Sequence, residues 1–159
     1  MKFNKAIKNL FIVLFSTLLI SACSTAKKAN VDTANDVYTG TDTVEFLAKG
    51  VPDRIFFATN KSKLTTASRD TLRKQATWMR KNKDVTVTVE GHADERGTRE
   101  YNLALGERRA NAAKDYLMTY GVSGKRISVI SYGKERPVNP ASSPLAWSQN
   151  RRSVTVKAN

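Results

Sequence analysis

The chain has a single cysteine, Cys23, and a single histidine, His92, among its 159 residues. One cysteine cannot form an internal disulfide, so the protein must fold without one. A zinc site usually takes three or four protein ligands, mainly histidine and cysteine. These side chains are too few for such a site, and we expect neither a metal nor another cofactor.

Long apolar runs are absent as well. The run from Leu10 to Ile20 spans 11 residues and is interrupted by Ser16 and Thr17, whereas a helix that crosses a bilayer needs about 20. The run follows a start with three lysines and no acid, and small residues come after it. This order is typical of a secretory signal, and we predict a signal peptide over residues 1–22.

The single cysteine ends a motif with a chemical meaning. Ile20-Ser21-Ala22-Cys23 resembles the lipobox of bacterial lipoproteins, in which cleavage before the cysteine exposes it for acylation. Several acyl chains anchor a protein stably where one chain is marginal. By the same resemblance, Ser24 favours the outer membrane. We expect an outer-membrane lipoprotein anchored through Cys23 with its domain in the periplasm; the alternative is an ordinary signal peptide.

Acidic residues are scarce relative to basic ones. The chain has 14 Asp and Glu against 27 Lys and Arg, a net charge of +13, and removal of the signal peptide would leave about +10. A balance of this kind favours a polyanionic partner. A periplasmic location argues against nucleic acid and favours the anionic cell wall or a membrane surface.

Composition changes along the chain predict its organisation. Residues 24 to about 42 are rich in small and polar residues and contain no aromatic side chain before Tyr38. We therefore predict that residues 23–51 carry the lipidated cysteine and a flexible linker. Residues 52–159 are more apolar and long enough for one domain with its own core.

Hydrophobic periodicity predicts a βαβαβ order and a two-layer α/β sandwich. Leu72, Ala76 and Met79 share one face of the first expected helix, and valines alternate with threonines in the second expected strand. The expected strands are 54–57, 85–89, 127–132 and 153–157; the expected helices are 66–82 and 99–120, with a helical turn at 145–150.

Residues 91–110 contain eight charged side chains directly after an apolar run. Asp94 and Glu95 could act as the paired carboxylates of a cell-wall hydrolase, although the domain is small for a long sugar cleft. His92 could act in nucleophilic catalysis only with a partner nucleophile, and the sequence contains no nucleophile-elbow motif. Non-enzymatic binding is the favoured interpretation, with the hydrolase and a non-specific polyanion binder as alternatives.

Arg109 has an unusual position on the second expected helix. With Leu105 at zero and about 100° per residue, Arg109 falls near 40°, inside a stripe that includes Ala112, Tyr116 and Tyr120. Arg108 falls near 300°, on the margin. A buried cation must be paired, because an unpaired buried charge is costly. Arg109 therefore needs an anionic partner.

Asp94 is the candidate partner, because its loop leads into the N-terminus of this helix. Two arrangements are open. The two side chains could form an internal salt bridge, or they could flank a pocket and bind a ligand that carries both charges.

The sequence motifs also resemble a known family. The segments 91–98 (GHADERGT), 100–102 (EYN), 105–110 (LGERRA), 131–135 (SYGKE) and 150–154 (NRRSV) are similar to the OmpA-like domain of peptidoglycan-associated lipoproteins. The resemblance implies helices on one face of a mixed sheet, an α+β fold, and no enzymatic activity. It also implies non-covalent binding of peptidoglycan, and contact with TolB and other proteins of the Tol-Pal system in cell division and envelope integrity.

The same resemblance implies specific site residues. Asp94 and Arg109 match the positions that hold meso-diaminopimelate in the family, and Phe57, Leu105 and Asn102 match positions that line its pocket. The chain departs from the family after the first strand, because Ala58 and Asn60 stand where acidic residues are common. Contacts from that loop are therefore in question.

Overall fold

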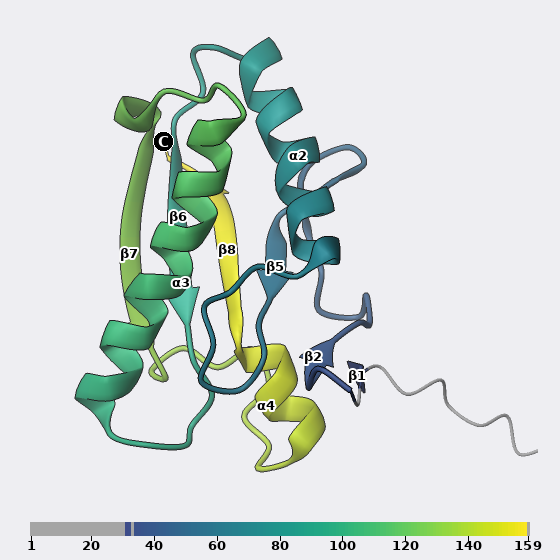
Figure 1. Cartoon of the computed structure of the whole chain (residues 1–159), viewed down its shortest axis with the longest axis vertical. Coiled ribbons are helices and arrows are strands. Elements are labelled where there is room, and N and C mark those ends of the chain that lie inside the picture. Colours follow the sequence, from purple (N-terminus) through teal and green to yellow (C-terminus); the bar gives the residue numbers. More distant parts are fainter. Residues whose placement is uncertain (1–30, 33, 159) are drawn as a thin grey trace, which may run out of the picture.

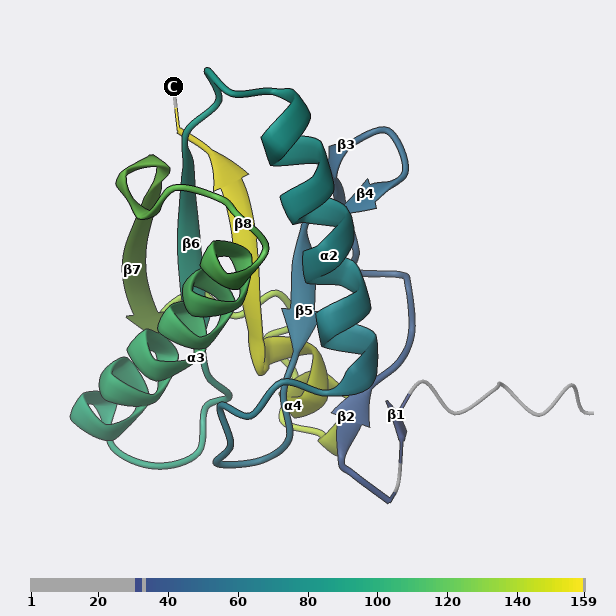
Figure 2. The ribbon, with the colours of Figure 1, turned by 45° about the horizontal axis from the view of Figure 1, so that its top comes forward.

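The computed structural model describes residues 31–32 and 34–158, and a four-stranded sheet forms its centre. The strand order is β5-β8-β6-β7, with β6 parallel to β7 and β8 antiparallel to β5 and β6. Two helices, α2 and α3, cover one face of this sheet (Figures 1 and 2). The predicted α+β sandwich is therefore confirmed. The strands are β5 (Arg54–Phe56), β6 (Val87–His92), β7 (Ile127–Gly133) and β8 (Arg152–Lys157).

The helices begin where side chains can cap them. Helix α2 (Thr66–Lys81) follows Thr65, whose side chain accepts from the backbone N–H of Ser68. Helix α3 (Arg99–Thr119) follows Thr98, whose side chain accepts from the N–H of Tyr101. Such caps satisfy N–H groups that have no partner in the helix. Both predicted helices are confirmed to within one residue at each end. Short helices occupy Gly124–Arg126 (η1) and Pro144–Asn150 (α4).

The core lies between the helices and the sheet. Leu72, Ala76 and Met79 of α2 are fully buried, as predicted, and pack with Val87 and Val89 of β6. These five side chains belong to a larger buried apolar cluster that also includes residues of β5, α3 and β7, and its burial holds the two layers together. No helix in the described part of the chain is long and apolar enough to cross a membrane.

The buried stripe of α3 differs slightly from the predicted one. Arg109 is fully buried and Arg108 is exposed, as the helical angles indicated. Tyr116 and Tyr120 are only partly buried, so the stripe is centred nearer Ala113 than expected. The side chain of Arg109 nevertheless lies inside it.

The second strand begins and ends later than predicted. Val85 lies outside β6 and donates its N–H to the carbonyl of Asn82. At the other end, Glu90 and Gly91 pair with both β7 and β8, and His92 pairs with β7. The prediction of a strand over 85–89 is wrong in its bounds because the partner strands, rather than the apolar run, decide where the pairing stops.

The segment predicted to be a flexible linker is partly ordered. Four short strands lie in or next to it: β1 (Val31–Asp32), β2 (Val37–Tyr38), β3 (Phe46–Ala48) and β4 (Val51–Pro52). Tyr38 is buried, and its ring packs edge-on against Phe56 at 4.7 Å between centroids. A few apolar side chains in this polar segment are thus buried against β5. The flexible linker over residues 23–51 stays a prediction. Cys23 and the predicted signal peptide lie outside the described residues.

Strand β6 and helix α3 approach each other closely. A Cβ atom added to Gly91 would lie 1.8 Å from the carbonyl oxygen of Gly106. Only glycine permits this backbone contact. The contact fixes the first half of α3 over the end of β6, which is where the charged residues gather.

Candidate ligand-binding site

The candidate site lies at one end of the sheet, where β5 and β6 end and β8 begins. Phe56 and Arg152 are paired in the antiparallel register, so these chain ends are neighbours. The loops 57–65 and 93–98 and the junction of α4 with β8 meet there (Figure 1). The 93–98 loop brings Asp94 and the α4–β8 junction brings Arg151 to the same place as Arg109 of α3.

Arg109 donates only to backbone carbonyls in the described part of the chain. Its Nε, Nη1 and Nη2 atoms lie 2.9 Å from the oxygen of Lys61, 2.8 Å from that of His92 and 3.1 Å from that of Ala58, respectively. Its guanidinium carbon lies 5.3 Å from the ring centroid of Phe57. Arginine has five N–H donors, so one N–H on each terminal nitrogen is left for another acceptor.

Asp94 is buried and accepts from two other arginines. Its Oδ1 accepts from the backbone N and the Nε of Arg96, both at 3.1 Å. Its Oδ2 accepts from Nη2 of Arg96 at 2.7 Å and from Nη1 of Arg151 at 3.3 Å. Burial alone would raise the pKa of Asp94, but the hydrogen bonds and charge of Arg96, with Arg151, outweigh it and hold the pKa below its usual value. Asp94 is therefore a carboxylate at neutral pH.

Asp94 and Arg109 share the site without forming a salt bridge in the described part of the chain. Burial and the neighbouring charge of Arg151 lower the pKa of Arg109 to about 9, and the charge of Asp94 opposes this shift. The internal salt bridge considered from the sequence is thus contradicted. Arg109 keeps a buried charge that no described carboxylate contacts, and a carboxylate is the group that would stabilise it most.

The other predicted site residues surround this pair. Phe57 is fully buried, and Leu105 and Asn102 are nearly so. The side-chain amide of Asn102 donates to the carbonyl of Arg96 at 2.8 Å, so it holds the loop that carries Asp94. This contact gives Asn102 a scaffold role in the described structure.

Arg151 is the residue that sequence reasoning missed. It is 1% exposed, and its Nε donates to the carbonyl of Phe57 at 3.1 Å. Its Nη2 lies 3.0 Å from Oδ1 of Asp36. The only signal in the sequence was its place in the motif 150–154, directly before the last strand. Nothing in the spacing distinguished it from its neighbour Arg152.

Comparison with known proteins identifies the family. Residues 56–151 match the OmpA family. The chain belongs to the OmpA family. It is 45% identical over 150 residues to the peptidoglycan-associated lipoprotein of Brucella melitensis, covering 91% of this chain and 89% of that protein. It is 46% identical over 149 residues to the one of Rhizobium meliloti, covering 91% and 85%.

Solved structures agree with this assignment. The crystal structure of the peptidoglycan-associated lipoprotein from Burkholderia pseudomallei has a TM-score of 0.65 and 32% identity, covering 67% of this chain and 90% of that one. The C-terminal domain of Helicobacter pylori MotB shares the fold, with a TM-score of 0.63 at 23% identity, covering 67% and 84%. The family resemblance and the expectation of a non-enzymatic protein are both confirmed by these relationships.

The geometry of Asp94 and Glu95 agrees with a non-enzymatic OmpA-family domain. The carboxylate of Glu95 is exposed and accepts from Nε1 of Trp147 at 2.8 Å, and this hydrogen bond lowers its pKa. A glycosidase needs one carboxylic acid whose pKa is raised so that it can donate a proton. The pKa values of Asp94 and Glu95 are instead both lowered. Among residues 31–32 and 34–158, no group of three potential metal ligands occurs.

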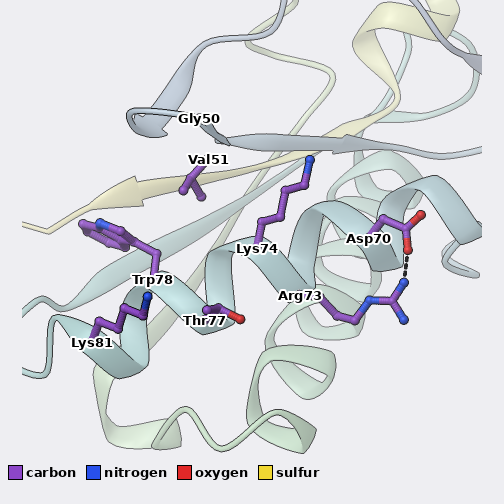
Figure 3. A pocket seen from close by; sticks show the side chains of 8 residues that line it. All are labelled: Gly50, Val51, Asp70, Arg73, Lys74, Thr77, Trp78 and Lys81. Carbon is purple, nitrogen blue, oxygen red and sulfur yellow. Dashed lines mark hydrogen bonds and ion pairs between the residues drawn. The ribbon is translucent and has the colours of Figure 1, made fainter.

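A hollow on this OmpA-family domain lies away from these residues, between α2 and the turn that joins β3 to β4 (Figure 3). Its volume is about 750 Å³. Lys74, Lys81 and Trp78 line it together with an ion pair between Asp70 and Arg73. None of these residues belongs to the cluster around Arg109, so the positive charge of the chain is spread over more than one surface.

Proposed function

We propose that this protein binds peptidoglycan non-covalently by holding the side-chain end of meso-diaminopimelate between Asp94 and Arg109. One observation carries the proposal: Arg109 is fully buried, contacts no carboxylate among the described residues, and has an unused N–H on each terminal nitrogen. The relatives at 45% and 46% identity are named peptidoglycan-associated lipoproteins, which supports the same ligand here.

The chemistry of that ligand matches the site. The end of the diaminopimelate side chain carries an ammonium and a carboxylate on one carbon. A planar guanidinium can bind a carboxylate through two parallel hydrogen bonds. Asp94, ionised at neutral pH, is the group that would attract the ammonium. A lysine side chain offers only the ammonium and would leave Arg109 without its partner.

Ligand binding requires a change around Asp94. Its two oxygens already accept four N–H groups, three from Arg96 and one from Arg151, and a carboxylate has about four such positions. The side chain of Arg96 is 41% exposed, whereas that of Arg151 is buried. Arg96 is therefore the group that moves away when the ammonium arrives.

The wider role follows from the same proposal. A lipid anchor at Cys23 would hold the domain at the outer membrane, and the wall contact at Arg109 would connect that membrane to peptidoglycan. We include TolB and the other Tol proteins as partners, with roles in envelope integrity and cell division. Changing Cys23 to Ser should release the protein from membrane fractions, because acyl chains provide most of the membrane affinity.

Calorimetry with defined ligands tests the proposed function. The full chain in detergent should bind a stem peptide that ends in meso-diaminopimelate about 30- to 3000-fold more tightly than its lysine counterpart, since losing one partner of a buried charge pair costs about 2–5 kcal/mol. Equal affinity for the two peptides would contradict it. Incubation with sacculi should leave the muropeptide profile unchanged, whereas a hydrolase would alter it.

A further inference from the structure

Asp36 joins the candidate site from outside the segment that matches the OmpA family. Its Oδ1 lies 3.0 Å from Nη2 of Arg151, and its carbonyl oxygen accepts from the same nitrogen at 2.5 Å. Its other carboxylate oxygen accepts from the hydroxyl of Thr59. Arg96 donates to that hydroxyl at 3.1 Å and to Asp94 at 2.7 Å. Asp36 thus closes a ring of polar contacts that includes Asp94, the side chain to which the proposed function assigns the ammonium of the ligand.

The backbone around Asp36 is fixed by its neighbours. Val37 and Tyr38 are buried beside Phe56. Asp36 itself has a φ of 53°, a left-handed conformation that Asp and Asn adopt more readily than most residues. This conformation and the two buried neighbours direct the carboxylate at Arg151. The contact between Asp36 and Arg151 is therefore held in place by the fold of the N-terminal segment.

The charges of the site give this contact a consequence. Three arginines, Arg96, Arg109 and Arg151, face two carboxylates, Asp94 and Asp36. Arg151 contacts both carboxylates, and its contact with Asp94 is the longer of the two, 3.3 Å against 3.0 Å. Without the charge of Asp36, Asp94 would be the one anionic partner of Arg151 among the described residues. Arg151 would then compete more strongly with any ammonium for Asp94.

We infer that Asp36 is a positioning residue that determines how well the site binds the ammonium end of its ligand, by holding Arg151 partly away from Asp94. This inference rests on the proposed function. It extends the binding site to a residue before position 56, where the match to the OmpA family begins. It also explains how a site without acidic side chains at Ala58 and Asn60 still contains a second carboxylate.

The variant Asp36→Asn tests the inference. Asparagine keeps the shape of the side chain and tolerates the left-handed backbone, so only the charge is removed. Three stem peptides serve as probes: one ends in meso-diaminopimelate, one in lysine, and one in 2-aminopimelate, which keeps the side-chain carboxylate but lacks its ammonium. Affinities are measured by calorimetry on the full chain in detergent.

The expected result is a split among the ligands. Asp36→Asn should weaken binding of the diaminopimelate peptide about fivefold and leave the 2-aminopimelate peptide unchanged or slightly tighter. Asp32→Asn removes the same charge from the same segment. Among the described residues, the Asp32 side chain forms hydrogen bonds only with Ala34 and Asn35, so this variant should change neither affinity. Equal losses for the diaminopimelate and 2-aminopimelate peptides, or no loss for the former, would overturn the inference. Failure of the unmodified chain to bind the diaminopimelate peptide would instead overturn the proposed function.

Discussion

The Nη1 atom of Arg151 lies 3.3 Å from Oδ2 of Asp94, so Arg151 rather than Arg109 is the buried arginine that pairs with the loop carboxylate. The two arginines therefore have separate tasks. Arg151 connects Asp94 to Phe57 and to the N-terminal segment, and Arg109 forms no ion pair with a carboxylate of the described residues. A site that used a single arginine for both purposes would have to break an internal ion pair before it could bind a carboxylate.

Replacing Arg109 should abolish selective binding. Arg109→Ala removes the group that recognises the ligand carboxylate, and the affinity for the diaminopimelate peptide should fall about 30- to 3000-fold. Arg109→Lys keeps the charge but lacks the planar guanidinium that can form two parallel hydrogen bonds. Its affinity should therefore lie between that of the unmodified chain and that of Arg109→Ala. The measurement is calorimetry, with circular dichroism to show that each variant is folded.

Arg108→Ala is the matched control, because Arg108 is the exposed neighbour on the same helix. It should change the affinity by less than about twofold. The ratio of affinities for the diaminopimelate and lysine peptides is independent of a uniform loss of folded protein. A ratio that survives in Arg109→Ala would exclude Arg109 as the carboxylate ligand.

Removing the side chain of Arg96 should tighten binding. Arg96 occupies three of the four acceptor positions of Asp94 through its backbone and side chain, and two of these contacts disappear in Arg96→Ala. The ammonium of the ligand would then meet no competing side chain from this loop. We expect the affinity for the diaminopimelate peptide to rise about threefold to tenfold, measured by calorimetry. A clear loss of affinity would mean that Arg96 itself contacts the ligand.

His92 should make the folded state sensitive to acid. Its side chain is 1% exposed, and neither ring nitrogen has a hydrogen-bond partner in the described structure. Burial, with the charges of Arg152, Arg136 and Arg54, lowers the pKa of His92 to about 3. The ring is therefore uncharged at neutral pH, and its approach to Glu90 at 3.5 Å is not an ion pair.

The sign of the pH effect follows from linkage. The unfolded chain binds a proton at His92 below about pH 6.5, whereas the folded chain does so only near pH 3, so acid favours unfolding across that window. Between pH 7 and pH 5 this group should reduce the free energy of unfolding by about 2 kcal/mol. In His92→Phe, which keeps the ring contact with Tyr132, this part of the pH dependence should vanish. Denaturant unfolding at both pH values measures it, and identical pH profiles would refute the assignment.

Gly91→Ala should destabilise the domain and weaken the site together. The new methyl group would overlap the backbone of Gly106, and inserting a carbon into packed structure costs about 1–3 kcal/mol or more. Strand β6 and helix α3 would have to separate, which moves Arg109 relative to the carbonyl of His92. Thermal unfolding and peptide binding should both decline. Gly124→Ala, whose neighbour is the flexible side chain of Met118, should change little.

The regular elements were predictable because their signals are local. Thr65 and Thr98 are capping residues directly before apolar periodicity, and both cap a helix in the structure. The burial of Arg109 was predictable for the same reason, since a helix repeats its faces along the chain. Its lack of an ion pair was not predictable, because it depends on three carbonyls from Ala58, Lys61 and His92 that are distant in sequence.

The N-terminal contacts could not be read from the sequence. Tyr38 is one aromatic residue in a polar segment, and its burial depends on the position of Phe56 in the folded sheet. The pairing of Asp36 with Arg151 joins positions 115 residues apart, and no periodicity connects them. Sequence patterns report which faces are apolar, whereas such ion pairs are decided by where separate loops meet.

The loop 58–61 takes part in the site through its main chain, because the carbonyls of Ala58 and Lys61 accept from Arg109. Every amino acid has a backbone carbonyl, so the chemical identity of these two side chains matters little to Arg109. What matters is the path of the loop, and Asn60 sets it with a φ of 55°, which asparagine tolerates and branched residues do not. Neutral side chains at positions 58 and 60 are thus compatible with an intact set of carbonyl contacts to Arg109. In this loop, the path of the main chain rather than the charge of its side chains determines how Arg109 is held.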